Sequence, residues 1–131
     1  MISIELPWPS ADLSPNARVH WATQARAKKK AKNHAWGFTK AVMSPLGIRS
    51  GSFVGPIAVR IVFHPEIDRG RDLDNMQARM KAALDGIALG LGVDDKHFRP
   101  VSEIGAKRKP ACVVVTLEPA MVAVPVRGEI S

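Results

Sequence analysis

One cysteine in 131 residues excludes an internal disulfide. Cys112 lies in the apolar segment 111–117, and we interpret it as a buried small hydrophobic residue of a protein from a reducing compartment. Neither His20 nor His34 has a second histidine or cysteine nearby at a metal-ligand spacing. We therefore predict no zinc site at either histidine.

Several other patterns are missing as well. The sequence has no P-loop, no glycine-rich dinucleotide turn and no histidine pair on a helix, which argues against ATP, NAD and zinc chemistry. No apolar run is long enough to span a bilayer, and the first residues do not have the pattern of a signal peptide. We expect a cytoplasmic protein with no nucleotide cofactor and no membrane partner.

Acidic residues are absent between positions 18 and 40, in a chain whose formal net charge is +7. The absence of proline and the many alanines predict a helix from about Val19 to Met43. Its expected inner face carries Trp21, Ala25, Ala35, Trp36 and Val42, and its outer charge comes from Arg18, Arg26, Lys28, Lys29, Lys30, Lys32 and Lys40. Such a helix suits contacts with nucleic-acid phosphates, although the same charge could merely keep the protein in solution.

The acids are concentrated elsewhere. Seven of the twelve lie between positions 66 and 95: Glu66, Asp68, Asp72, Asp74, Asp85, Asp94 and Asp95. Carboxylates this close repel one another, and a hard divalent cation such as Mg²⁺ suits all-oxygen ligands. A helix expected over 75–91 places Lys81 on one face with Asp74 and Asp85, at about 100° per residue. Its opposite, apolar face carries Met76, Met80, Ala83, Leu84, Ile87 and Leu91.

A structural interpretation of the same residues stays open. Asp72 or Asp74 could be a helix N-cap, Lys81 and Asp85 an i,i+4 pair, and Gly92 a helix stop. That interpretation is weaker for four carboxylates together, since one cap needs one carboxylate.

The order of elements predicts the fold class. Strands are expected over 2–6, 56–64, 101–109 and 111–117, with the two helices between them. This pattern indicates a single α/β (α+β) domain over residues 1–118 with a small mixed sheet and two main helices, followed by a C-terminal tail over 119–131.

The acidic motifs resemble a known family. Asp-Leu-Asp-Asn at 72–75, Lys-Ala-Ala-Leu-Asp at 81–85 and Val-Asp-Asp at 93–95 resemble the RusA family of Holliday junction resolvases. The resemblance extends to 6–10 and 16–20 and covers most of residues 2–118. One departure is that Lys81 stands six residues after Asn75, whereas the spacing in a member of that family is three.

The resemblance implies a RusA-like fold and a Mg²⁺-dependent endodeoxyribonuclease, with Mn²⁺ as another possible ion, that resolves four-way DNA junctions as a homodimer. By motif it implies Asp72, Asp74 and Asp95 as catalytic metal ligands and Lys81 as a catalytic lysine. We add Asp94, the neighbour of Asp95, as a further candidate metal ligand. Candidate DNA contacts are Asn16, Arg18, Arg26, Lys28, Lys29, Lys30, Lys32, Arg69 and Arg71. No aromatic-rich base-reading motif is present, so we expect recognition of DNA shape.

Two other functions fit the composition. A non-catalytic DNA-binding accessory protein of phage origin would use the acidic cluster for capping and ion pairing. A phosphatase or nucleotide hydrolase would use the carboxylates but would gain little from the basic segment.

Overall fold

The computed structural model describes residues 1–68 and 70–120. It contains a four-stranded mixed sheet in the order β1-β4-β2-β3, formed by β1 (Ile2–Pro7), β2 (Ile57–His64), β3 (Phe98–Ile104) and β4 (Cys112–Pro119). β4 pairs antiparallel with both β1 and β2, whereas β2 and β3 are parallel. Among the described residues this confirms the predicted fold class, a small α+β domain with a mixed sheet.

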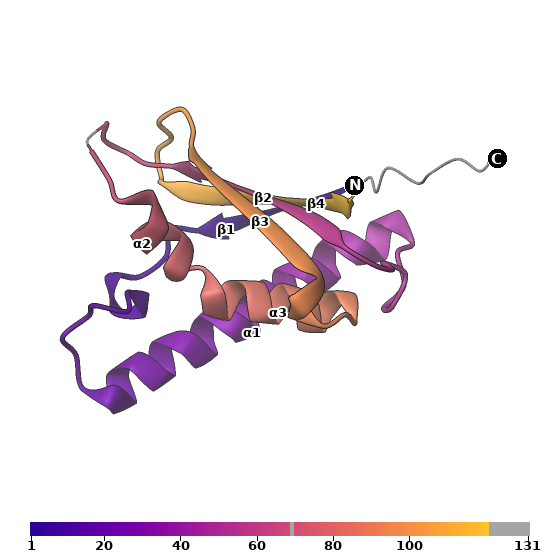
Figure 1. Cartoon of the computed structure of the whole chain (residues 1–131), viewed down its shortest axis with the longest axis horizontal. Helices are drawn as coiled ribbons and strands as arrows, with labels where there is room; N and C mark the ends of the chain where they lie inside the picture. The colour runs from indigo at the N-terminus through magenta and orange to yellow at the C-terminus, as the bar shows by residue number, and fades with distance from the viewer. Residues whose placement is uncertain (69, 121–131) are drawn as a thin grey trace.

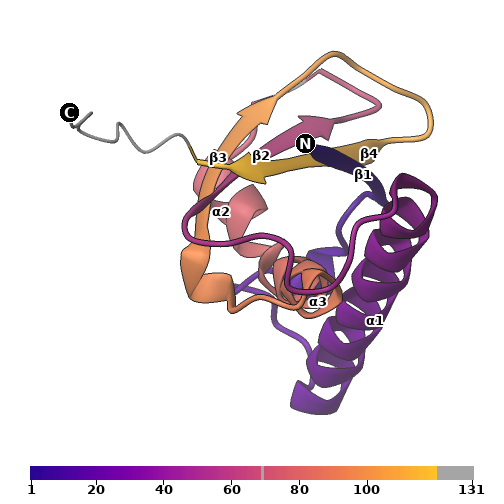
Figure 2. The same ribbon diagram turned by 90° about the vertical axis from the view of Figure 1, so that its right-hand side faces the viewer.

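The helices cover one face of this sheet (Figures 1 and 2). They are α1 (Trp21–Leu46), α2 (Leu73–Ala78) and α3 (Lys81–Leu91), and the short 3-10 turns η1 (Ala11–Leu13) and η2 (Asp95–His97) flank them. The parallel pair β2 and β3 is joined by α2, α3 and η2. This crossover carries every residue of the acidic motifs.

Alternating side chains of the strands form the core. Rows of buried residues run across the sheet, such as Leu6, Val113 and Phe63, which occupy matching register positions on β1, β4 and β2. Burying an aliphatic or aromatic side chain contributes roughly 1.5–3 kcal/mol relative to leaving it exposed. The alternation predicted for the first strand is confirmed, because Ile2, Ile4 and Leu6 are all buried.

The first helix differs from its prediction at both ends and on its inner face. It starts at Trp21 and continues through Pro45 to Leu46. A proline in the last turn removes only one hydrogen bond, so the helix tolerates Pro45 there. Gly47, at φ 68°, ends the helix in the left-handed conformation. Trp21 is 76% exposed and Trp36 44% exposed, so neither belongs to the core. The buried positions are Ala35, Thr39 and Met43, on the part of α1 that α3 contacts.

The predicted helix over 75–91 is two helices. α2 ends at Ala78, and the Met80 N–H bonds to the Gln77 carbonyl at 2.9 Å, a tighter turn than an α-helix makes. α3 then begins at Lys81 and runs in a different direction (Figure 1). The six residues predicted for the apolar face are nevertheless all buried, because both helices turn their apolar side toward the same core.

The C-terminal boundaries also need correction. The strand predicted over 101–109 is β3, which starts at Phe98 and ends at Ile104, so the basic residues 107–109 lie in the β3–β4 connection. β4 extends through Pro119, and the Ala120 N–H bonds to the Pro56 carbonyl at 2.9 Å. The folded domain therefore extends past residue 118. The rest of the predicted tail, 121–131, lies outside the described residues.

Candidate functional site

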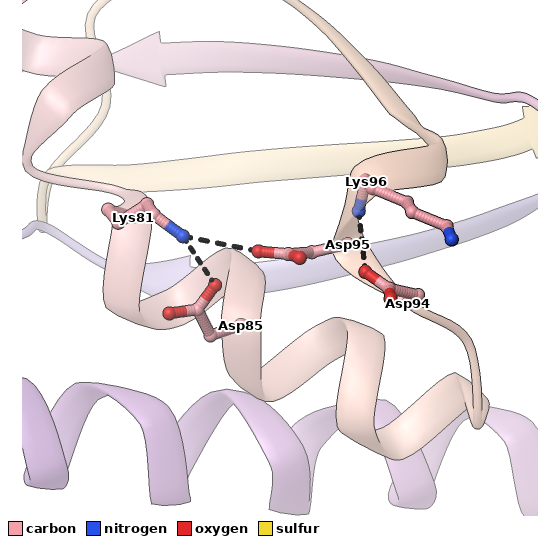
Figure 3. A network of polar contacts seen from close by, with 5 residues as sticks. All are labelled: Lys81, Asp85, Asp94, Asp95 and Lys96. Atoms are coloured by element: carbon pink, nitrogen blue, oxygen red, sulfur yellow. Dashed lines mark hydrogen bonds and ion pairs between the residues drawn. The ribbon is translucent and has the colours of Figure 1, made fainter.

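Lys81 is the centre of a charged network at the start of α3. Its ammonium donates to Asp85 Oδ1 at 2.9 Å, one turn further along the helix, and to Asp95 Oδ2 at 3.1 Å, across the turn that follows α3 (Figure 3). The predicted neighbourhood of Lys81 and Asp85 is thus confirmed. Asp95 joins them because Gly92 ends α3 in the left-handed conformation and the chain returns along the helix.

Asp94 has a structural role beside this network. Its carboxylate accepts a hydrogen bond from the Lys96 backbone N–H at 3.0 Å and caps η2 (Figure 3). That contact fixes the turn from which Asp95 reaches Lys81.

The network changes the proton affinity of its members. Hydrogen bonds from Asp85 and then Asp95 raise the pKa of Lys81, so the ammonium stays charged at neutral pH. A hydrogen bond shared with the Asp85 carboxyl, followed by the Lys81 ammonium, lowers the pKa of Asp95. Lys81 therefore acts as a fixed positive charge and cannot accept a proton.

Asp72 and Asp74 lie on α2, on the other side of the helix break. Asp72 is the N-cap of α2 and accepts the Asn75 backbone N–H at 3.3 Å. In the described part of the chain, Asp74 is exposed and makes no side-chain hydrogen bond or ion pair. The placement of Asp74 on one face with Lys81 assumed a continuous helix and was wrong, since the axis changes direction between them.

The carboxylates are consequently not assembled as one compact group. Within residues 1–68 and 70–120, no three His, Cys, Asp or Glu side chains are grouped so that they could hold one metal ion. Asp85, Asp94 and Asp95 do line a single shallow hollow of about 360 Å³ with Lys81 and Lys32. These oxygen donors match the chemistry that Mg²⁺ prefers.

A basic groove adjoins this acidic hollow. It has a volume of about 610 Å³ between α1 and the junction of α2 and α3. Its charged lining consists of Lys28, Lys29, Lys32, Arg79, Lys81 and Asp85. Three of the predicted phosphate contacts therefore lie next to Lys81. Lys32, Lys81 and Asp85 line both the groove and the acidic hollow, so the two adjoin each other.

The other predicted DNA contacts are distributed around this groove. Arg26 and Lys30 line a neighbouring hollow on the side of β1, and Asn16 and Arg18 are exposed before α1. The Arg71 guanidinium lies 5.1 Å from the Trp8 ring centre and donates to the Ile67 carbonyl at 3.3 Å, so this arginine already has intramolecular partners. Arg69 lies outside the described residues.

Three residues of the site were not among the predicted site residues. Asp85 is a direct partner of Lys81, and Arg79 lines the basic groove at the helix break. Ser14 donates to Asn75 Oδ1 at 3.1 Å and ties the loop before α1 to α2. The i,i+4 spacing could have included Asp85. Nothing local in the sequence marks Arg79 or Ser14.

Comparison with known proteins adds a relative but no activity. No protein-family model matches the chain. A protein of Xylella fastidiosa, described as uncharacterized, is 45% identical over 101 residues, and the match covers 75% of this chain and 63% of that relative. Within the described residues, no helix has the length and apolar character needed to cross a membrane.

Proposed function

We propose that this protein is a Mg²⁺-dependent endodeoxyribonuclease that cuts branched DNA, the activity implied by its resemblance to the RusA family. The observation that carries the proposal is that the groove lined by Lys28, Lys29 and Lys32 adjoins the hollow lined by Asp85, Asp94 and Asp95. A DNA strand needs cationic contacts along its backbone, and hydrolysis of its phosphodiester needs oxygen ligands for a metal beside them. Lys81 lies where the two surfaces meet.

The basic residues bind phosphate groups, and the acidic residues bind the metal ion. Lys28, Lys29 and Lys32 hold the phosphates of the strand in the groove. Lys81, whose raised pKa keeps it protonated, neutralises the phosphate that is attacked and does not serve as the base. Asp94 and Asp95, which line the acidic hollow, would hold Mg²⁺ or Mn²⁺. The resemblance also implies Asp72 and Asp74 as ligands, but these two lie on the other side of the helix break. Such an ion supplies a water of lowered pKa and neutralises negative charge on the phosphate.

The reaction adds one water across the phosphodiester bond. The bond to the 3′ oxygen breaks, leaving a 3′ hydroxyl and a 5′ phosphate. Resolution of a four-way junction needs two such cuts at positions related by two-fold symmetry, and a homodimer meets that requirement most simply.

A non-catalytic DNA-binding protein is the second candidate, and a specific observation favours it. Asp72 caps α2, Asp94 caps η2, and Asp95 pairs with Lys81, which is the capping and ion-pair network that this alternative requires. Such a protein would bind DNA through the basic groove without a metal ion.

Cleavage of a labelled four-way junction separates the two candidates. We expect wild-type protein in Mg²⁺ to introduce paired nicks in the junction and none in a matched linear duplex, and excess chelator to abolish them. Asp95→Asn and Asp74→Asn should bind the junction without cutting it. Glu118→Gln, an exposed acid on β4, serves as the control and should cut normally. Binding without scission by wild type in both Mg²⁺ and Mn²⁺ would instead support the accessory protein.

A further inference from the structure

A second, largely apolar hollow lies beside the basic groove. It has a volume of about 590 Å³ and is bounded by the segment after β1, by α1 and by the start of α3. Leu6, Leu13, Met80 and Ala83 contribute apolar surface, and Trp8 contributes an aromatic ring. Leu13 and Arg79 line both the hollow and the groove, which makes them neighbours. The volume falls within the roughly 300–1,000 Å³ typical of small-ligand sites.

The walls of this hollow are held in place. The Trp8 ring packs edge-on against Phe63, with ring centres 6.0 Å apart, and Arg71 lies over its face. The Gln24 side chain donates to the carbonyls of Asp12 and Ser14, both at 3.3 Å, which ties the loop to α1. An occupant would therefore enter a largely preformed site and would order little of the protein on binding.

The charged residues around the hollow select the kind of occupant. Arg26, Lys30 and Arg79 line it with a single acid, Asp12. The surroundings thus favour an aromatic group attached to an anion.

We propose that this hollow holds one unpaired nucleobase of the DNA strand whose phosphates contact Lys28, Lys29 and Lys32. This inference rests on the proposed function. The faces of a base match the Trp8 ring and the apolar lining of the hollow, and the adjoining phosphates match Arg26 and Lys30. In a linear duplex the bases are stacked and paired, so only a base freed at a branch point can enter. The hollow therefore distinguishes branched from linear DNA without reading a sequence.

The test compares a short single strand of DNA with a strand of the same length in which every site is abasic, so that the phosphates are retained and the bases are removed. Binding is measured by anisotropy in excess chelator, which prevents cleavage. Stacking of one base corresponds to roughly 5- to 150-fold in affinity, so wild type should bind the strand with bases at least about fivefold more tightly. A 2-aminopurine placed in the strand should also lose fluorescence on binding.

Two α1 variants assign this preference to the hollow. Ala31→Phe fills it from the half-buried face of α1, and it should remove the preference and the fluorescence change while leaving affinity for the abasic strand. Ala41→Phe, at an exposed α1 position that does not line the hollow, is the matched control and should behave as wild type.

The possible failures can be told apart. Equal affinity of wild type for the two strands, or a preference that survives Ala31→Phe, would overturn the base-binding site. Neither result would contradict phosphate binding in the basic groove. If Ala31→Phe weakens binding of both strands, the 2-aminopurine signal of wild type decides, and an unchanged signal overturns the proposal. Absence of binding to either strand or to a four-way junction would overturn the proposed function as well.

Discussion

Replacement of Gly86 by alanine tests the closest contact between α1 and α3. A Cβ built on Gly86 overlaps the Lys32 carbonyl oxygen and lies 3.1 Å from the Ala35 Cβ. The obstructing atoms are backbone, which a side-chain rotation cannot move, so the helices must separate. Gly37, on α1, is the matched control because a Cβ there meets nothing within 4 Å.

The two substitutions should have opposite effects. Because the contact is with backbone atoms, overpacking should cost about 2–3 kcal/mol, the upper part of its usual range, and the higher helix propensity of alanine returns up to about 1 kcal/mol. Gly86→Ala should therefore be less stable by about 1–2 kcal/mol. An unfolding entropy near 2.1 cal/mol/K per residue, over about 130 residues, converts this into a Tm lower by roughly 4–7 °C. Gly37→Ala gains only the propensity, and its Tm should rise by about 2–4 °C.

The assay is thermal unfolding followed by circular dichroism, together with junction binding. Because Lys32 lines both the groove and the acidic hollow, separation of the helices should also weaken junction binding by Gly86→Ala and not by Gly37→Ala. A Gly86→Ala protein as stable as wild type, with Gly37→Ala stabilised as expected, would refute the close approach of the helices.

Three further predictions concern the charged network and the caps. In Lys81→Met, the pKa of Asp95, measured by NMR titration, should rise toward the ordinary aspartate value of about 3.9. An unchanged pKa would show that the Lys81 ammonium does not lower the pKa of Asp95. Since the folded-state pKa of Asp95 is depressed, wild type gains stability above the unfolded pKa and loses it as pH falls through the folded pKa, and the loss should be smaller in Lys81→Met. Asp72→Ala should lower the free energy of unfolding, measured by urea titration, by about 0.5–2 kcal/mol, and Asp72→Asn should lower it much less because asparagine also caps helices. Equal stability of the two variants would rule out the cap. If Asp72 binds the metal, both substitutions should abolish cleavage. Lys28→Gln should reduce the slope of log K against log salt concentration for duplex binding by about 0.9. An unchanged slope would show that Lys28 does not contact a phosphate.

The part of the site that could be predicted is the part with a local pattern. The acid-free segment 18–40 predicted an exposed basic helix, and the Lys81–Asp85 pair followed from i,i+4 spacing. The break between α2 and α3 could not be predicted, because residues 75–91 contain no proline and keep one apolar stripe throughout. Only packing against the sheet shows that α2 and α3 reach the same core from two directions.

The exposed Trp21 and Trp36 of α1 show that the burial of a helix face could not be predicted from its spacing alone. A helical period identifies one face of a helix, but it does not say how much of the helix has a partner. α3 contacts α1 at Lys32, Ala35 and Thr39, whereas Trp21 lies on the first turn, outside that contact, and remains exposed. Arg26, Lys30 and Ala31 of the N-terminal half of α1 line the apolar hollow.

The sequence by itself determined the α+β class, the alternation of the first strand, the buried side of α2 and α3, and the separation of basic from acidic segments. Each of these follows from residue spacing within one element or from composition, which are local properties. The tertiary structure decided that Asp95 rather than Asp74 contacts Lys81, that Asp72 and Asp94 act as caps, and that the basic groove adjoins both the apolar hollow and the acidic hollow. These depend on the direction in which each element leaves the core, and that direction is fixed only when the whole chain is packed.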